Sequence, residues 1–162
     1  MVPFLNAGLQ NGEYCLWVPT DMVSIEESVR VLSNYIHDFG IYQNTGQMEI
    51  ISPDEWYRPN GSFHVPHVLK QVRDKTSAAH AKKFKGVRGA GGIHKISRSG
   101  WKSILDYESQ IHHLTARLDI TILCTYSLPN CPLKHIPKII ENHHKTFLKK
   151  GWNWEVVAGK GV

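Results

Sequence analysis

The side chains with the most chemical potential lie at the end of one apolar segment. Residues 118–123 are mostly aliphatic and β-branched, and Cys124 and Tyr126 follow before a Ser-Leu-Pro-Asn turn. Such a run predicts an interior strand of a parallel sheet. Because ligands of open α/β sheets bind beyond the carboxyl ends of the strands, Cys124 and Tyr126 are candidates for ligand contact. The alternative for Cys124 is a plain core position, since free cysteines are often fully buried.

The motifs required for nucleotide hydrolysis and for nucleophilic catalysis are incomplete. The glycine-rich segment 86–92 lacks the Gly-Lys-Ser/Thr sequence that begins a helix and cradles phosphates in a Walker motif. The chain also contains no Gly-x-Ser-x-Gly sequence. Cys124 and His143 are the best candidate nucleophile and base, but nothing in the sequence places them together. We therefore expect a protein that is not an enzyme, with no catalytic residues and no cofactor.

The ten histidines raise the question of a metal site. The neighbours His112 and His113 point to different sides of a helix, and the same holds for the pair at 143–144. His64 and His67 could share a helical face, but no acidic residue is placed as an obvious third ligand. We predict no metal site, although Cys124 with one histidine would be a suitable pair for a transition metal.

An aromatic-rich turn occupies residues 54–63. Trp56 and Tyr57 in such a loop, beyond the end of a strand, would form a lid or wall for a small apolar or weakly polar ligand. The alternative is an aromatic plug that covers the core.

The remaining pattern alternates strands with helices. Ser24 and Glu27 form a capping box at the start of one helix. We expect helices at 2–10, 24–37, 65–82, 101–117 and 133–143, and strands at 14–18, 47–51, 84–95 and 119–126, with a short extended segment at 40–42. Two terminal strands, at 146–149 and 152–157, would complete the sheet. This order predicts a three-layer α/β fold with a mostly parallel sheet.

Length and composition are those of one globular domain. The chain has 162 residues, of which 41% are hydrophobic and 20% charged. No apolar run reaches the roughly 18–20 residues that span a bilayer, and no secretory signal is present, so we expect a cytoplasmic protein that does not enter membranes. The net charge is +5, but the basic residues are spread out, which disfavours direct binding to nucleic acid. Three cysteines do not suggest a disulfide framework.

Several short motifs, taken in order, resemble the MEDS domain, a sensory domain named for methanogens and methylotrophs. They are Val2-Pro3-Phe4-Leu5 with Gly8 and Gly12, Gly46-Gln47-Met48-Glu49-Ile50, Trp56-Tyr57 with Gly61 and Phe63, Gly86-Val87-Arg88, Leu105-Asp106-Tyr107-Glu108, and Leu123-Cys124-x-Tyr126. The resemblance implies a RecA-like α/β domain, similar to P-loop NTPases, that lacks a Walker A motif. It implies one sensory domain over 1–157, without the first strand of the family, and a flexible tail over 158–162.

The resemblance also implies a function and a site. The domain would bind a small organic ligand, a one-carbon or hydrocarbon-derived compound, and act on a signalling or transcription-regulatory protein. The expected ligand-binding residues are Trp56, Tyr57, Arg88, Tyr107, Glu108, Cys124, Tyr126 and His143, with Arg88 and Glu108 making polar contacts or an internal ion pair. Departures from the family pattern fall at Gly92, Lys95, His112 and Ser127. The alternative is a degenerate module for protein interaction or homo-oligomerisation that binds no ligand.

Overall fold

The computed structural model describes residues 1–92, 96 and 100–158. At its centre lies a parallel sheet of four strands in the order β2-β1-β3-β4. These strands are β1 (Tyr14–Val18), β2 (Met48–Ile50), β3 (Val87–Gly92) and β4 (Ile120–Thr125). The expectation of an α/β fold built on a mostly parallel sheet is confirmed.

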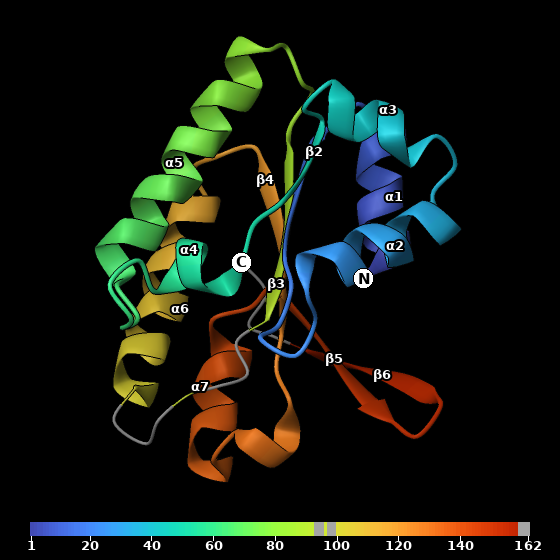
Figure 1. Cartoon of the computed structure of the whole chain (residues 1–162). Helices are drawn as coiled ribbons and strands as arrows, with labels where there is room; N and C mark the ends of the chain where they lie inside the picture. The colour runs from blue at the N-terminus through green and yellow to red at the C-terminus, as the bar shows by residue number, and fades with distance from the viewer. Residues whose placement is uncertain (93–95, 97–99, 159–162) are drawn as a thin grey trace.

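Helices cover both faces of this sheet (Figure 1). One face carries α1 (Val2–Gln10), α2 (Ile25–Tyr35) and α3 (Phe39–Asn44), and the other carries α4 (Pro53–Tyr57), α5 (Val65–Ala81) and α6 (Trp101–Thr115). Side chains alternate along the strands, so that Cys15 of β1 joins the core beneath α1 and α2. Its neighbours Tyr14 and Leu16 join the separate core beneath α5 and α6.

Serine caps determine where two of the helices begin. The Ser24 hydroxyl accepts a hydrogen bond from the Glu27 amide at 3.1 Å, as the capping box predicts. Ser52 caps the short helix α4 in the same way through the Glu55 amide at 3.2 Å, and Pro53 provides the fixed φ that suits a first helical turn. Ser52 therefore fixes where the chain turns to carry Trp56 toward the sheet.

Below the sheet, the segment after β4 folds into short helical turns. These are the 3₁₀ turns η1 (Leu128–Asn130) and η2 (Leu133–His135) and the helix α7 (Ile136–Glu141). They bury a third core against the start of α6, made of Trp101, Ile104, Cys131 and Ile139. The predicted single helix at 133–143 is thus shorter and irregular, because Pro132 and Pro137 interrupt the pattern.

Two expectations about the elements are wrong. The terminal strands β5 (Lys145–Lys150) and β6 (Asn153–Ala158) do not complete the main sheet but pair antiparallel with each other in a separate hairpin. The reason is a tight turn at Gly151, whose φ of 60° brings the second strand straight back onto the first. Residues 40–42, expected to be extended, lie within α3, because Asp38 adopts a left-handed φ of 56° and starts a new helix there.

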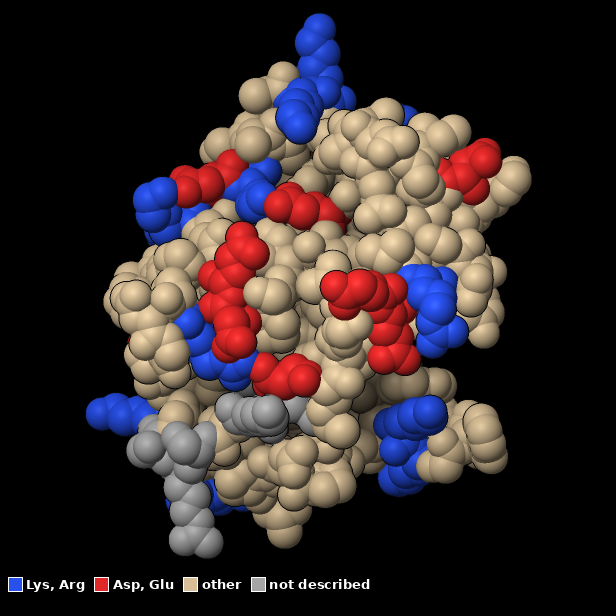
Figure 2. All heavy atoms as spheres, viewed as in Figure 1, with Lys and Arg blue, Asp and Glu red and all other residues tan. Residues whose placement is uncertain are grey.

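Charged side chains are mixed over the visible surface. Figure 2 shows Lys and Arg interspersed with Asp and Glu over much of one face, without a continuous basic stripe on that face. Among the described residues, no helix is both long enough and apolar enough to cross a membrane.

Candidate functional site

A cavity lies between the sheet and the helices α5 and α6 and extends along β3 and β4, from Val87 and Ile120 to Gly92 and Thr125 at their carboxyl ends. Its volume is about 40 Å³, and its walls include Val18 of β1 and Ile122 of β4. Trp56, Tyr57, Tyr107, Glu108, Cys124 and Tyr126, all expected from the sequence, line it as well. The structure therefore brings together six of the eight predicted ligand-binding residues, which come from α4, α6 and the end of β4.

Two glycines leave room for the cavity. Gly89 and Gly91 occupy alternate positions of β3, so both lack a side chain on the face toward α5 and α6. A methyl group added to Gly91 would lie only 2.5 Å from the Tyr57 hydroxyl, whereas one added to Gly89 would make an ordinary 3.7 Å contact with Ile122. Gly91 thus lets the Tyr57 hydroxyl lie close against β3. Sequence reasoning did not place Gly91 in the site, although alternate glycines in a strand signal an open face.

The carboxyl group of Glu108 is the most deeply buried ionisable group of the site, with a residue exposure of 1%. Its Oε1 accepts a short hydrogen bond from the Tyr126 hydroxyl. Its Oε2 lies 3.4 Å from Nε2 of His143 and accepts no hydrogen bond from any group that the structure describes. Burial raises the pKa of the Glu108 carboxyl, and His143 and the Tyr126 hydrogen bond oppose that effect.

His143 completes the cluster from beyond the end of α7. Its Nδ1 lies 2.7 Å from the carbonyl oxygen of Ile139. Because a carbonyl oxygen can only accept, Nδ1 must carry a proton, and in a neutral imidazole the lone pair is then on Nε2. That lone pair is on the nitrogen next to Glu108. The family resemblance placed His143 and Glu108 in one site, but their direct contact depends on how α7 packs against α6 and does not follow from the spacing of the residues.

The thiol and phenol groups of the cavity are uncharged at neutral pH, whereas the ammonium group of Lys75, which also lines the cavity, pairs with Glu49. Burial raises the pKa of the Cys124 thiol well above its usual value, and the Glu108 carboxylate adds to that effect. Burial also raises the pKa values of the phenols of Tyr57, Tyr107 and Tyr126. A protonated thiol is a poor nucleophile, so this arrangement suits binding better than nucleophilic attack.

Aromatic contacts fix the wall of the cavity. The ring of Phe63 stacks on Tyr57 at a centroid distance of 5.7 Å and meets the edge of Tyr107 at 5.6 Å. Both tyrosines are buried. Since each ring limits the movement of the next, the Tyr57 hydroxyl cannot swing away freely. The aromatic turn thus packs on the core and walls the cavity at once, which joins the two alternatives drawn from the sequence.

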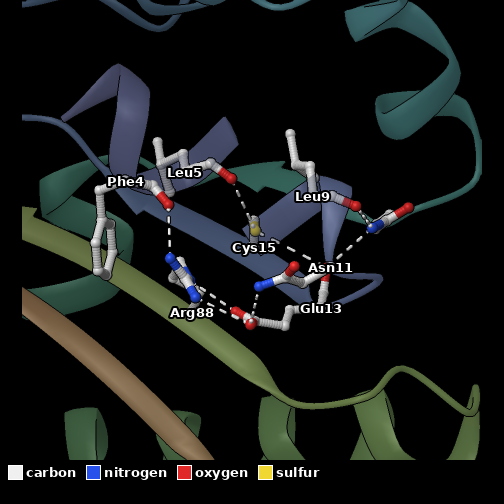
Figure 3. A network of polar contacts seen from close by, with 8 residues as sticks. Phe4, Leu5, Leu9, Asn11, Glu13, Cys15 and Arg88 are labelled. Atoms are coloured by element: carbon white, nitrogen blue, oxygen red, sulfur yellow. Dashed lines mark hydrogen bonds and ion pairs between the residues drawn. The ribbon is translucent and has the colours of Figure 1, made fainter. Parts of the chain in front are cut away.

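Arg88 lies apart from this cluster, on the opposite face of the sheet (Figure 3). Its guanidinium pairs with Glu13, at 2.6 Å for Nε and 2.9 Å for Nη2, and also donates to the carbonyl oxygen of Phe4 at 3.0 Å. It stacks over the Phe4 ring at 4.9 Å. The internal ion pair considered for Arg88 and Glu108 is therefore wrong, because neighbouring positions of β3 face opposite sides of the sheet. Arg88 fastens α1 to β3 instead.

The positions where the sequence departs from the family pattern are only partly near the cavity. Gly92 lines the cavity next to Thr125, whereas Ser127 begins the η1 turn. The ring of His112 contacts that of His144 at 4.9 Å. Lys95 and residues 159–162 of the expected tail lie outside the described residues.

Comparison with known proteins identifies a family and a similar solved structure. The family model described as "MEthanogen/methylotroph, DcmR Sensory domain" (MEDS) matches residues 1–144. The β5–β6 hairpin lies outside that match. No curated protein matches the chain. The crystal structure of the flagellar accessory protein FlaH from Methanocaldococcus jannaschii is similar, with a TM-score of 0.49 and 11% sequence identity over 95% of this chain and 67% of that chain.

Proposed function

This chain belongs to the MEDS family of sensory domains, and from that premise we propose that it senses a small organic molecule in the cavity between β3, β4 and α6. The ligand would be a one-carbon or hydrocarbon-derived compound. The observation that carries this proposal is a small cavity with mostly apolar walls, lined by glycines of β3 and by the polar groups of Glu108 and Cys124.

The size of the cavity supports a very small ligand. A volume of about 40 Å³ accommodates roughly one to three groups of the size of water. Leu16, Val18 and Ile122 supply apolar walls, while Glu108 and Cys124 supply polar and polarizable atoms at one end. A compound with one carbon and one heteroatom would fit both the volume and this division of the surface.

The helix α4 would transmit the effect of ligand binding to a partner protein. This helix has five residues and carries Trp56 and Tyr57, which line the cavity. Immediately after it, Arg58 forms ion pairs with Asp21, in the loop after β1, and with Asp54. A ligand that binds more tightly to one position of α4 would shift its population and so change the surface offered to a signalling or transcription-regulatory protein. The proposal is for a sensor rather than an enzyme, which the protonated Cys124 thiol supports.

A second candidate function, a protein-interaction module that needs no ligand, is favoured by the β5–β6 hairpin. Phe147, Trp152, Trp154 and Val156 of this hairpin are all more than half exposed. Exposed aromatic side chains of this kind are enriched where proteins bind one another. Under this alternative, a Trp154→Ser variant would lose self-association or partner binding, measured by analytical ultracentrifugation, while small molecules would have no effect.

The proposed function is tested by the thermal unfolding of the full chain in the presence of methanol, methylamine, methanethiol or formaldehyde. A ligand at a hundredfold excess over its Kd stabilises the folded state by about 2.7 kcal/mol, which is roughly 5–10 °C for a domain of this size. We expect at least one compound to raise the Tm of the wild type and of Tyr35→Leu, whose side chain is exposed, but not of Tyr57→Leu. An equal rise in both variants, or none in the wild type, would contradict the proposal.

A further inference from the structure

The side chains of Glu108, Cys124 and His143 form a compact set of three different donors. One oxygen, one sulfur and one nitrogen atom from these residues all lie within 4.8 Å of one another. The sequence brings them from three separate elements, α6, β4 and the segment after α7. We infer that these residues bind a divalent transition-metal ion, with zinc as the best match, and leave its fourth position open to the cavity. This inference deepens the proposed function, because the fourth position is where the small ligand would bind.

The distances suit a tetrahedral ion. Zinc bonds of about 2.0–2.2 Å to nitrogen and oxygen and about 2.3 Å to sulfur place ligand atoms roughly 3.3–3.7 Å apart. Glu108 Oε2 and His143 Nε2 already lie 3.4 Å apart. The remaining ligand atom, Cys124 Sγ, lies within 4.8 Å of one ring nitrogen of His143 and of one carboxylate oxygen of Glu108, so a shift of about 1 Å closes the set around an ion.

An unpartnered buried atom points into this set. Glu108 is 1% exposed, and its Oε2 receives no hydrogen bond from the described residues. When the imidazole of His143 is neutral, its Nε2 carries the lone pair, because Nδ1 donates a proton to Ile139. This nitrogen and Glu108 Oε2 then face each other as two electron-rich atoms 3.4 Å apart in a buried place, where an unsatisfied polar group is costly. A cation between them would satisfy both.

The groups behind the donors are those that orient metal ligands. A ligating histidine usually donates its second ring N–H to a carbonyl or a carboxylate, and a ligating carboxylate is itself hydrogen-bonded. Here Ile139 receives the Nδ1 proton of His143, and Tyr126 donates to the second carboxylate oxygen of Glu108. Each of these two ligands is therefore held by a partner that leaves its metal-facing atom free.

The charge and the chemistry of the donors select the ion. When a divalent ion binds, the Cys124 thiol releases its proton to solvent and the sulfur becomes a thiolate ligand. With the Glu108 carboxylate, the two negative charges then balance the metal, and the buried complex is neutral. A sulfur donor and a single carboxylate do not suit Mg²⁺ or Ca²⁺, which need several oxygen ligands. Three mixed donors with one open position are typical of zinc sites that receive a further ligand.

The competing place for an ion is the group of surface histidines. His112 and His144 have ring centroids 4.9 Å apart, and His112 also touches His113. Exposed histidines bind transition metals without a built site, so a matched test must separate the two places. His112→Gln serves as the control for His143→Gln, and Cys131→Ser as the control for Cys124→Ser.

The experiment uses the full chain, stripped with a chelator, dialysed and then titrated with Zn²⁺ in competition with a chromogenic chelator. We expect one tight site per chain, weakened by more than about tenfold in Cys124→Ser and His143→Gln and unchanged in the two controls. Because Cys124→Ser or His143→Gln could unfold, Co²⁺ is added to the wild type and to Cys131→Ser as a spectroscopic probe. Both should show the charge-transfer absorption of a thiolate bound to Co²⁺.

The outcomes separate this inference from the proposed function. Zinc binding that survives Cys124→Ser but not His112→Gln would overturn it, as would a wild-type Co²⁺ complex without thiolate absorption. A stripped chain that responds to methanethiol but binds no Zn²⁺ would refute the metal site and leave the sensor standing. A chain that binds Zn²⁺ at Cys124 but no small molecule would do the reverse.

Discussion

Adding a single methyl group at Gly91 should displace Tyr57 from the wall of the cavity, and the structure indicates the size of the effect. The new carbon would lie 2.5 Å from the Tyr57 hydroxyl oxygen, whereas non-bonded heavy atoms prefer about 3.5 Å or more. Tyr57 would have to move by about 1 Å, against a ring held by Phe63. Forcing an extra methyl into a packed site costs about 1–3 kcal/mol.

Gly89→Ala is the matched control for this change. Both glycines belong to β3, and neither has a positive φ, so each alanine variant gains about 0.4–1 kcal/mol from a less flexible unfolded chain. The new methyl at Gly89 meets only Ile122, at 3.7 Å. The gain cancels between the two variants, and Gly91→Ala should therefore be less stable than Gly89→Ala by about 1–3 kcal/mol.

Urea unfolding followed by circular dichroism measures this difference directly. We also expect Gly91→Ala to lose the ligand-induced rise in Tm, since its methyl group displaces Tyr57 from the wall of the cavity, and Tyr35→Leu, altered at an exposed side chain, to keep it. Equal stabilities for Gly91→Ala and Gly89→Ala would show that Tyr57 yields without cost, and the argument that Gly91 is needed for the close approach of Tyr57 would fail.

Two further predictions concern residues outside the cavity. Arg88→Met leaves the carboxylate of Glu13 without its ion-pair partner, and both side chains are less than one-fifth exposed in the native protein. The free energy of unfolding should therefore fall by about 3 kcal/mol, while the ligand-induced rise in Tm persists. Loss of that rise at unchanged stability would show that Arg88 belongs to the ligand site. Burial, and then the hydrogen bond to Glu49, raises the pKa of Tyr14 above 10, its ordinary value. Because the unfolded chain loses this proton near pH 10 and the folded protein does not, the contribution of Tyr14 to stability should be constant below pH 10 and fall above it, by up to about 1.4 kcal/mol per pH unit. Tyr14→Phe should flatten that fall in urea-unfolding curves at pH 9–11, and an unchanged slope would assign it to other groups.

Much of the sheet could be predicted because its signals are local. The apolar run before Cys124 and the capping box at Ser24 each report on a few neighbouring residues, and both elements form where these patterns place them. The grouping of Cys124 with Tyr57 followed from one general rule, that the ends of parallel strands meet at one edge of the sheet. Local pattern and topology together were enough for this part of the site.

The remaining features depend on contacts between distant parts of the chain. His143 meets Glu108 only because α7 folds back against α6, and no spacing in the sequence encodes that approach. Arg88 is one residue from the glycines that open the cavity, yet it faces the other side, since a shift of one residue reverses the face of a strand. The terminal strands formed as predicted in position, but Gly151 turned them onto each other rather than onto the sheet.

The claim that this cavity binds a small organic molecule is tested most directly by saturation-transfer NMR on the full chain with the same one-carbon compounds. Saturation of protein methyl groups should transfer to at least one compound bound to the wild type and to Tyr35→Leu, and the transfer should vanish in Gly91→Ala. Transfer of equal strength in all three proteins would place the ligand elsewhere, and no transfer to any compound in the wild type would contradict the account.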